Sequence, residues 1–121
     1  MKATISNYGV STKIEIIENN EVVCNLLFDI DHQYGCGVIT DLISFQKNKG
    51  YAKAALIEAF AWLYENQSYK IMVSNSRSNE ANAMYEHIFN MSFENNEVIA
   101  FNYNEEDGFE YNNEATENIN N

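Results

Sequence analysis

Three lysines gather around one glycine in the middle of an acidic chain. Lys47, Lys49 and Lys53 fall within seven residues, and Gly50 lies between them. A glycine at this position lets the backbone approach a ligand closely. The apolar spacing that follows predicts a helix, whose first turn carries unpaired N–H groups and a partial positive charge. Such a turn is an anion site with phosphate as its usual ligand, although a plain helix start with solvated lysines has the same pattern.

The overall charge argues against two classes of partner. The chain has 121 residues, with 18 acidic side chains against seven Lys and Arg, and a formal net charge of −11. Nucleic acid and anionic membrane surfaces are both bound through lysine and arginine, so we expect neither as a partner.

Cysteine content and hydropathy indicate the compartment. Two cysteines, Cys24 and Cys36, fit a reducing interior better than a disulfide framework, and they are too few for a structural zinc site, so no metal is expected. No apolar run approaches the roughly 18 residues that a membrane span needs. We therefore expect a cytoplasmic protein, in the host cytoplasm if the chain is viral.

The elements that must position the lysine cluster predict a mixed sheet. Alternation and short apolar runs predict strands at 13–18, 22–30, 38–45, 69–74, 91–94 and 97–103. Asn19-Asn20 predicts a turn between the first two. Helical spacing predicts one helix from about Gly50 to Asn66 and a second from Ser78 or Asn79 to about Phe89. This order predicts an α/β (α+β) fold: a mixed, largely antiparallel sheet with a central βαβ crossover and helices packed on it.

The acidic excess is concentrated at the C-terminal end. Residues 104–121 carry six acids and no base, which leaves twelve acids, all seven bases and a net charge of −5 for residues 1–103. The polar composition of 104–121 predicts a flexible acidic tail that solvates the protein or folds on contact with a partner. Residues 1–103 are then expected to form a single domain.

The stretch from Val38 to Phe93 resembles the GNAT superfamily of acetyl-coenzyme A dependent N-acetyltransferases. The family places Arg/Gln-x-x-Gly-x-Gly/Ala between a strand and a long helix, and residues 47–52 here read Lys-Asn-Lys-Gly-Tyr-Ala. Gln46 lies one position before this hexapeptide. The resemblance implies a GNAT-like version of the mixed sheet.

The second predicted helix carries a further family motif, Asn-x-x-Ala-x-x-x-Tyr followed by Gly-Phe. Ala81 and Tyr85 hold the Ala and Tyr positions, and Ser78 stands where Asn is expected. Ser92-Phe93 replaces Gly-Phe after a slightly longer connection. The two motifs occur in the family's order, with the expected helix and strand between them.

The resemblance implies acetyl-coenzyme A as the cosubstrate. The main chain of the central strand would pair with the pantetheine arm, and the loop amides would hold the pyrophosphate. The implied binding set is Thr40, Asp41, Leu42, Gln46, Lys47, Asn48, Lys49, Gly50, Tyr51, Ala52, Lys53, Ser78 and Asn79.

Family members transfer acetyl from the thioester to an amine by direct attack, which implies an acid and a base. Tyr85 would protonate the leaving thiolate, since a phenol pKa of roughly 10 is close to that of a thiol; packing in the core is the other interpretation of the same residue. Asp41 is the candidate base, as a buried carboxylate in a cleft. Asp29, Asp31 and His32 are further candidates, and water could also deprotonate the amine.

The acceptor is expected to be a cationic amine, on a small molecule or a protein, because residues 1–103 remain acidic outside the lysine cluster. Residues 1–12 are too few for the two helices that usually shape the family's acceptor site, which suggests a large acceptor or a homodimer that completes the cleft. His87 is expected to face away from Tyr85. The alternative function is a catalytically degenerate GNAT-like binding or inhibitor protein that acts through its acidic surface and tail.

Overall fold

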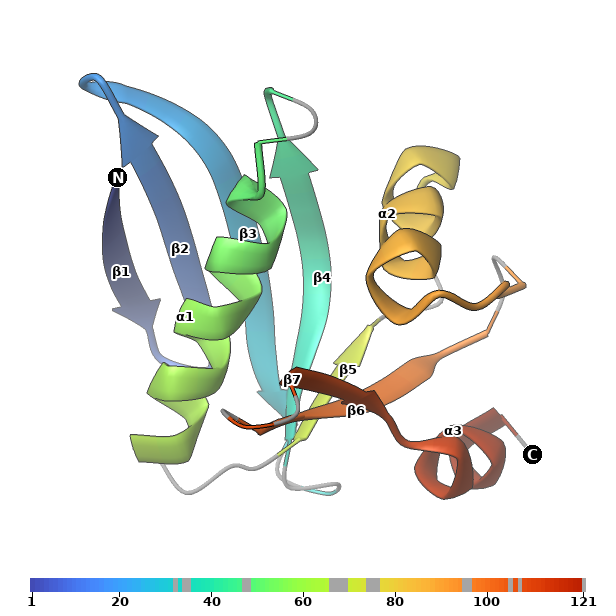
Figure 1. The fold of residues 1–121 in the computed structure, drawn as a ribbon. Helices are drawn as coiled ribbons and strands as arrows, with labels where there is room; N and C mark the ends of the chain where they lie inside the picture. Colours follow the sequence, from blue (N-terminus) through green and yellow to red (C-terminus); the bar gives the residue numbers. More distant parts are fainter. Residues whose placement is uncertain are drawn as a thin grey trace.

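Seven strands and three helices form the part of the chain that the computed structural model describes, residues 1–31, 33, 36–46, 49–65, 70–73, 77–94, 97–104, 106 and 108–120 (Figure 1). In chain order they are β1 (Lys2–Tyr8), β2 (Ser11–Glu18), β3 (Glu21–Asp31), β4 (Cys36–Ser44), α1 (Tyr51–Glu65), β5 (Lys70–Val73), α2 (Asn79–Phe89), β6 (Ile99–Asn104), β7 (Gly108–Tyr111) and α3 (Asn113–Asn120). None of the helices in these described ranges is long and apolar enough to cross a membrane.

The described strands form one sheet in which spatial order follows chain order, from β1 at one edge to β7 at the other. All neighbours are antiparallel except β4 and β5, which run parallel. A parallel pair needs a crossover connection, and α1 supplies it. The mixed α+β class expected from the sequence is confirmed.

Two-residue turns connect the first three strands. Asn19 and Asn20 connect β2 to β3 with φ angles of 52° and 64°, the left-handed conformation of a type I′ hairpin turn. The predicted turn is therefore confirmed. Residues 2–8, for which the sequence pattern predicted no element, form β1. This edge strand has only Ala3 and Ile5 as aliphatic side chains, so its pairing with β2 has little signal in the sequence.

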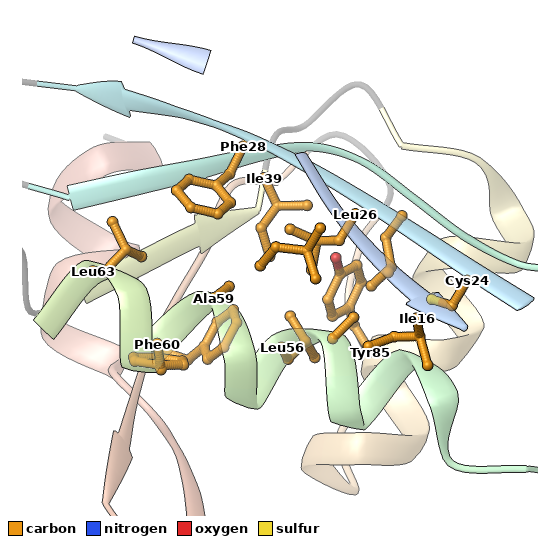
Figure 2. Packing of buried hydrophobic residues seen from close by; sticks show 14 of the residues in the cluster. Ile16, Cys24, Leu26, Phe28, Ile39, Leu56, Ala59, Phe60, Leu63 and Tyr85 are labelled. Carbon is orange, nitrogen blue, oxygen red and sulfur yellow. The ribbon is translucent and has the colours of Figure 1, made fainter. Parts of the chain in front are cut away.

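The core lies between the sheet and one face of α1. The helical stripe predicted after Gly50 is buried, and Leu56, Ala59 and Leu63 are all fully inaccessible. Figure 2 shows these side chains directed at buried residues of the sheet, including Phe28, Leu26 and Ile16. Burial of this stripe is the main reason that α1 forms here, because helices gain most of their stability from packing an apolar face.

The connection after α2 differs from the prediction. Residues 91–94 form no strand; side chains instead of a neighbouring strand bind their backbone groups. Arg77 donates to the carbonyl of Glu94 at 2.6 Å and also to that of Glu97, and Glu86 accepts from the N–H of Phe93 at 2.9 Å. The predicted strand at 97–103 exists, shifted slightly, as β6.

The acidic end of the chain is folded, which corrects the expectation of a flexible tail after residue 103. β7 pairs with β6, and its aromatic side chains join the core. The ring of Phe109 lies 5.9 Å from those of both Phe60 and Phe101, and Tyr111 lies 5.5 Å from Phe93. A few apolar anchors within a polar segment thus suffice to extend the sheet, although the average composition of the segment indicated disorder.

α3 completes the hydrogen bonding of β6 beyond the end of β7. The side-chain amide of Asn120 accepts from the N–H of Val98 at 2.9 Å and donates to its carbonyl at 2.8 Å. The buried hydroxyl of Thr116 accepts from the N–H of Ala100 at 3.0 Å. Polar side chains that appeared to belong to a solvated tail therefore bind the backbone of a strand.

We expect Thr116→Ala to destabilise the protein by about 1–3 kcal/mol, because it leaves the buried N–H of Ala100 without an acceptor. Thr116→Ser keeps the hydroxyl and is the matched control, expected to lose clearly less. Urea unfolding of the two variants and the parent measures the difference. Equal stability of all three would show that α3 is not docked on β6.

Candidate functional site

β4 loses its neighbour on one side halfway along its length. Its parallel pairing with β5 covers four residue pairs and ends where Ile39 meets Val73. On the other side β4 stays paired with β3 as far as Ser44. Within the described residues, the backbone edge of 40–44 that faces away from β3 thus has no strand beside it, and Figure 1 shows α2 on this open side.

A β-bulge in the pairing of β3 with β4 lies at the point where β4 separates from β5. Leu27 of β3 is opposite Asp41, whereas Phe28 is opposite Ile39, so Thr40 is the extra residue of β4. The hydroxyl of Thr40 donates to the carbonyl of Leu27 at 3.3 Å. A bulge bends its strand and raises the local twist, which turns the second half of β4 away from the direction of β5.

A cleft of about 1010 Å³ opens beside this half of β4. This volume lies at the upper end of the range of about 300–1,000 Å³ for small-molecule sites. Its walls come from the end of β4, the start of α1, one face of α2 and the start of β7. The lining residues are Leu42, Ile43, Ser44, Gln46, Lys49, Gly50, Tyr51, Ala52, Lys53, Ser78, Glu80, Ala81, Ala83, Met84, His87, Ile88, Gly108 and Phe109.

α1 begins at this cleft with a positively charged first turn. Gly50 has a φ of 77°, and its carbonyl accepts from the N–H of Ala54 at 3.0 Å. A Cβ added at Gly50 would meet no atom within 4 Å, so the backbone conformation, and not crowding, requires the glycine. The N–H groups of residues 51–53 have no acceptor within the helix, and Lys49 and Lys53 lie beside them. The arrangement can bind an anion.

The cleft gathers most of the binding residues predicted from the sequence. Those that line it are Leu42, Gln46, Lys49, Gly50, Tyr51, Ala52, Lys53 and Ser78. Thr40, Asp41 and Asn79 are not among the lining residues. Lys47 and Asn48 lie outside the described residues. The role of this set in binding a ligand stays a prediction.

The start of α2 is held by its own cap and by a residue that the sequence analysis missed. Ser78, one of the two predicted candidates, is the N-cap, and its hydroxyl accepts from the N–H of Ala81 at 3.1 Å. Arg77, the sole arginine of the chain, donates to the side chain of Asn82 at 2.7 Å. The Asn82 amide in turn donates to the carbonyl of Phe93 at 3.0 Å. This network holds α2, which forms one wall of the cleft. The sequence feature that could have predicted it is a single arginine next to a helix cap in an acidic chain.

Tyr85 lies in the core and does not line the cleft. Its side chain is 1% exposed, and Figure 2 shows it between α1 and the sheet, near Leu56 and Ile16. Its hydroxyl has no hydrogen-bond partner among the described residues. Burial raises the pKa of Tyr85 well above its usual range; the charge of Arg77 opposes this, and Asp41 adds to it. This position agrees with the interpretation of Tyr85 as a core residue. It also leaves the Tyr85 hydroxyl buried without a hydrogen-bond partner.

The candidate bases that the structure describes do not line the cleft. Asp41 is exposed, which corrects the expectation of a buried carboxylate. It is adjacent to buried Leu42, and successive side chains of a strand point to opposite faces, so Asp41 points away from α1. Asp29 accepts from the hydroxyl of Ser11 at 2.7 Å, and Asp31 accepts from the N–H of Gln33 at 2.9 Å. His32 lies outside the described residues.

Two other titratable side chains reach the cleft from α2. His87 is exposed and faces away from buried Tyr85, as expected, and it also lines the cleft, which was not expected. It lies four and three residues after Ala83 and Met84, which line the same wall, so helical spacing was the signal that could have found it. Glu80 lines the cleft near the start of the same helix. These two groups can exchange protons with a ligand or with water.

Metal and thiol chemistry have no support in the described part of the chain. It contains no group of three or more His, Cys, Asp or Glu placed to hold a metal ion. Cys24 is fully buried, and burial raises the pKa of its thiol to about 11. A buried thiol of this kind is inert as a nucleophile.

We expect Tyr85→Phe to keep or slightly raise stability near neutral pH, because it removes a buried hydroxyl that has no partner and keeps the ring. Above a pH of about 10 the unfolded tyrosine ionises while the folded one keeps its proton, so this group lowers stability as pH rises, by up to about 1.4 kcal/mol per pH unit. Unfolding free energies of Tyr85→Phe should therefore fall less steeply above this pH than those of the parent. Tyr8→Phe, at an exposed position, controls for the loss of a phenol. Equal slopes for the parent and Tyr85→Phe would contradict the buried hydroxyl.

Comparison with models of protein families and with curated proteins gave no match to this chain. The features of this chain that bear on function are therefore the geometry of the cleft and the two sequence motifs.

Proposed function

We propose that this chain is an acetyl-coenzyme A dependent N-acetyltransferase of GNAT-like fold, which moves an acetyl group from the thioester to a primary amine. The observation that carries the proposal is one cleft at which the open half of β4, the cationic start of α1 and one face of α2 meet. In the resemblance described above, these are the elements that hold the cosubstrate. The residues present fit it in both charge and shape.

The two ends of the cosubstrate match different parts of the cleft. The first-turn amides of α1, with Lys49 and Lys53, suit a pyrophosphate, because they combine backbone donors with positive charge. The edge of residues 40–44, which no described strand pairs with on the side away from β3, suits the amide-containing pantetheine arm, because that arm can pair with it as an added strand would. Apolar side chains of α2, Met84 and Ile88, line the cleft between these polar regions.

Bound acetyl-coenzyme A supplies an activated acetyl group, which passes to the amine nitrogen as the thiol departs. The protein must hold the amine neutral and return a proton to the sulfur. Glu80 and His87 are the described acid–base groups along the cleft other than lysine and Tyr51, and they can take the proton from the amine directly or through water. The unsatisfied hydroxyl of Tyr85 is the proton donor in this proposal, and it reaches the sulfur only if the thioester end of the cosubstrate extends from the cleft toward the core.

The acceptor in this proposal is a cationic amine on a small molecule or a protein. The sequence outside the lysine cluster is strongly acidic, and such a field raises the local concentration of cations. Glu80 carries this charge into the cleft itself.

Acetyl-coenzyme A in excess is expected to raise the melting temperature, since a ligand at a hundred times its Kd stabilises the native state by about 2.7 kcal/mol. The double variant Lys49→Glu, Lys53→Glu should lose most of this shift, measured against its own melting temperature. Lys2→Glu makes one such substitution on strand β1, away from the cleft, and should keep the full shift. Each single variant, Lys49→Glu or Lys53→Glu, matches its change of charge and should lose part of the shift. If the parent shows no shift, the proposed function is wrong.

Tyr85→Phe is expected to reduce turnover by roughly 100-fold, the usual contribution of a general acid, with the ligand-induced melting shift retained. The measurement is release of free thiol from acetyl-coenzyme A with a panel of amines. Full turnover by a folded Tyr85→Phe protein would exclude the acid role and leave Tyr85 as a core residue.

A second candidate function is a degenerate GNAT-like binding or inhibitor protein. The observation that favours it is the burial of Tyr85 together with the exposure of Asp41, which leaves both predicted catalytic groups outside the cleft lining. A melting shift with acetyl-coenzyme A but no thiol release with any amine would support this function over the enzyme.

A further inference from the structure

β1 is an edge strand without the usual protection. It pairs with β2 over seven consecutive residue pairs with no irregularity, and it forms one edge of the sheet. Natural edge strands are commonly blocked by charges, proline or bulges. The chain contains no proline, and the charged side chain of β1 is Lys2, at its end. Ile5 is 39% exposed and Tyr8 71% exposed.

Charge makes β1 unusual in this chain and suits it to a second copy. The protein carries a net charge of −11, so most contacts between two copies bring acids together. β1 contains no acid, whereas β7, the strand at the other edge of the sheet, contains Glu110. An interface through β1 is one of the few that avoids repulsion between copies.

The turn after β1 determines which backbone groups face outward. Gly9, with a φ of 82°, takes the first position of a two-residue turn as in type II′, and such a turn pairs Tyr8 with Ser11 through backbone hydrogen bonds. Backbone groups in an antiparallel strand alternate between the two sides. The backbone N–H and C=O groups of Tyr8 point toward β2. By alternation, those of Ala3, Ile5 and Asn7 point to the open side of the strand.

This outward set is centred on Ile5, which makes the edge self-complementary. We propose that two copies of this chain associate antiparallel through β1, around a two-fold axis at Ile5, to form one continuous sheet. In this register Ile5 lies opposite Ile5 of the second copy, and Ala3 lies opposite Asn7, so each outward backbone group finds a partner. On the other face Lys2 lies opposite Tyr8, a cation beside an aromatic ring, instead of opposite another cation.

The interface lies away from the cleft. β1 is separated from β4 by two strands, so each copy keeps its cleft open. A dimer formed in this way does not complete the cleft, in contrast to the arrangement considered from the sequence. The inference is independent of the proposed function, and either can fail alone.

Sedimentation equilibrium of the full chain over a range of concentrations tests the dimer. The parent should approach the mass of two chains as concentration rises. Ile5→Lys places two like charges at the axis and should halve the mass. Val22→Lys makes the same kind of change at a position that is also 39% exposed, away from the β1 edge, and should leave the dimer intact. Circular dichroism melting verifies that each variant is folded.

The two-fold axis predicts a specific rescue. Ile5→Lys and Ile5→Glu should each be monomeric alone, and an equimolar mixture should recover the mass of two chains, because unlike charges then meet at the axis. A monomeric parent at every concentration, a dimeric Ile5→Lys, or dissociation by Val22→Lys would each overturn the proposal. A mixture that stays monomeric would overturn the two-fold register.

Discussion

The site depends on the short extent of pairing between β4 and β5. In the described part of the chain, four parallel residue pairs hold the two strands together, and beyond Ile39 β4 bends at the Thr40 bulge and has no described residue of β5 beside it. Every other feature of the cleft follows from this divergence. It exposes a strand edge in the middle of the sheet, leaves room for α2 beside β4, and places the first turn of α1 at the mouth of the space.

The rigidity around this opening comes from hydrophobic packing on one side and from polar side chains on the other. α1 is held by fully buried residues against β2, β3 and β4. α2 and the connection after it are held by the side chains of Arg77, Asn82 and Glu86, which bind backbone groups of Phe93, Glu94 and Glu97. The acidic C-terminal segment contributes as well, since Phe109 packs in the aromatic core and lines the cleft.

Several elements were predictable because they carry strong local patterns. The stripe of α1, the Asn19-Asn20 turn and the cap at Ser78 each depend on neighbours in the chain, and each was confirmed. β1 was not predicted, because its side chains carry little apolar alternation. α3 was not predicted, because it is held by hydrogen bonds to a distant part of the chain: Thr116 binds Ala100 of β6, and Asn120 binds Val98 just before it. Residues 91–94 were wrongly predicted as a strand, since periodicity alone cannot detect side chains that replace a partner strand.

The sequence by itself determined the cationic helix start, because a glycine that permits positive φ and nearby lysines are local properties of residues 47–53. Only the tertiary structure decided what surrounds it. Tyr85 is buried in the core because of how α2 packs on the rest of the protein. Asp41 is exposed on the face away from α1 because of the alternation of side chains in β4 after the bulge. Likewise His87 reaches the cleft because of how α2 docks, which is set by contacts between segments far apart in the chain.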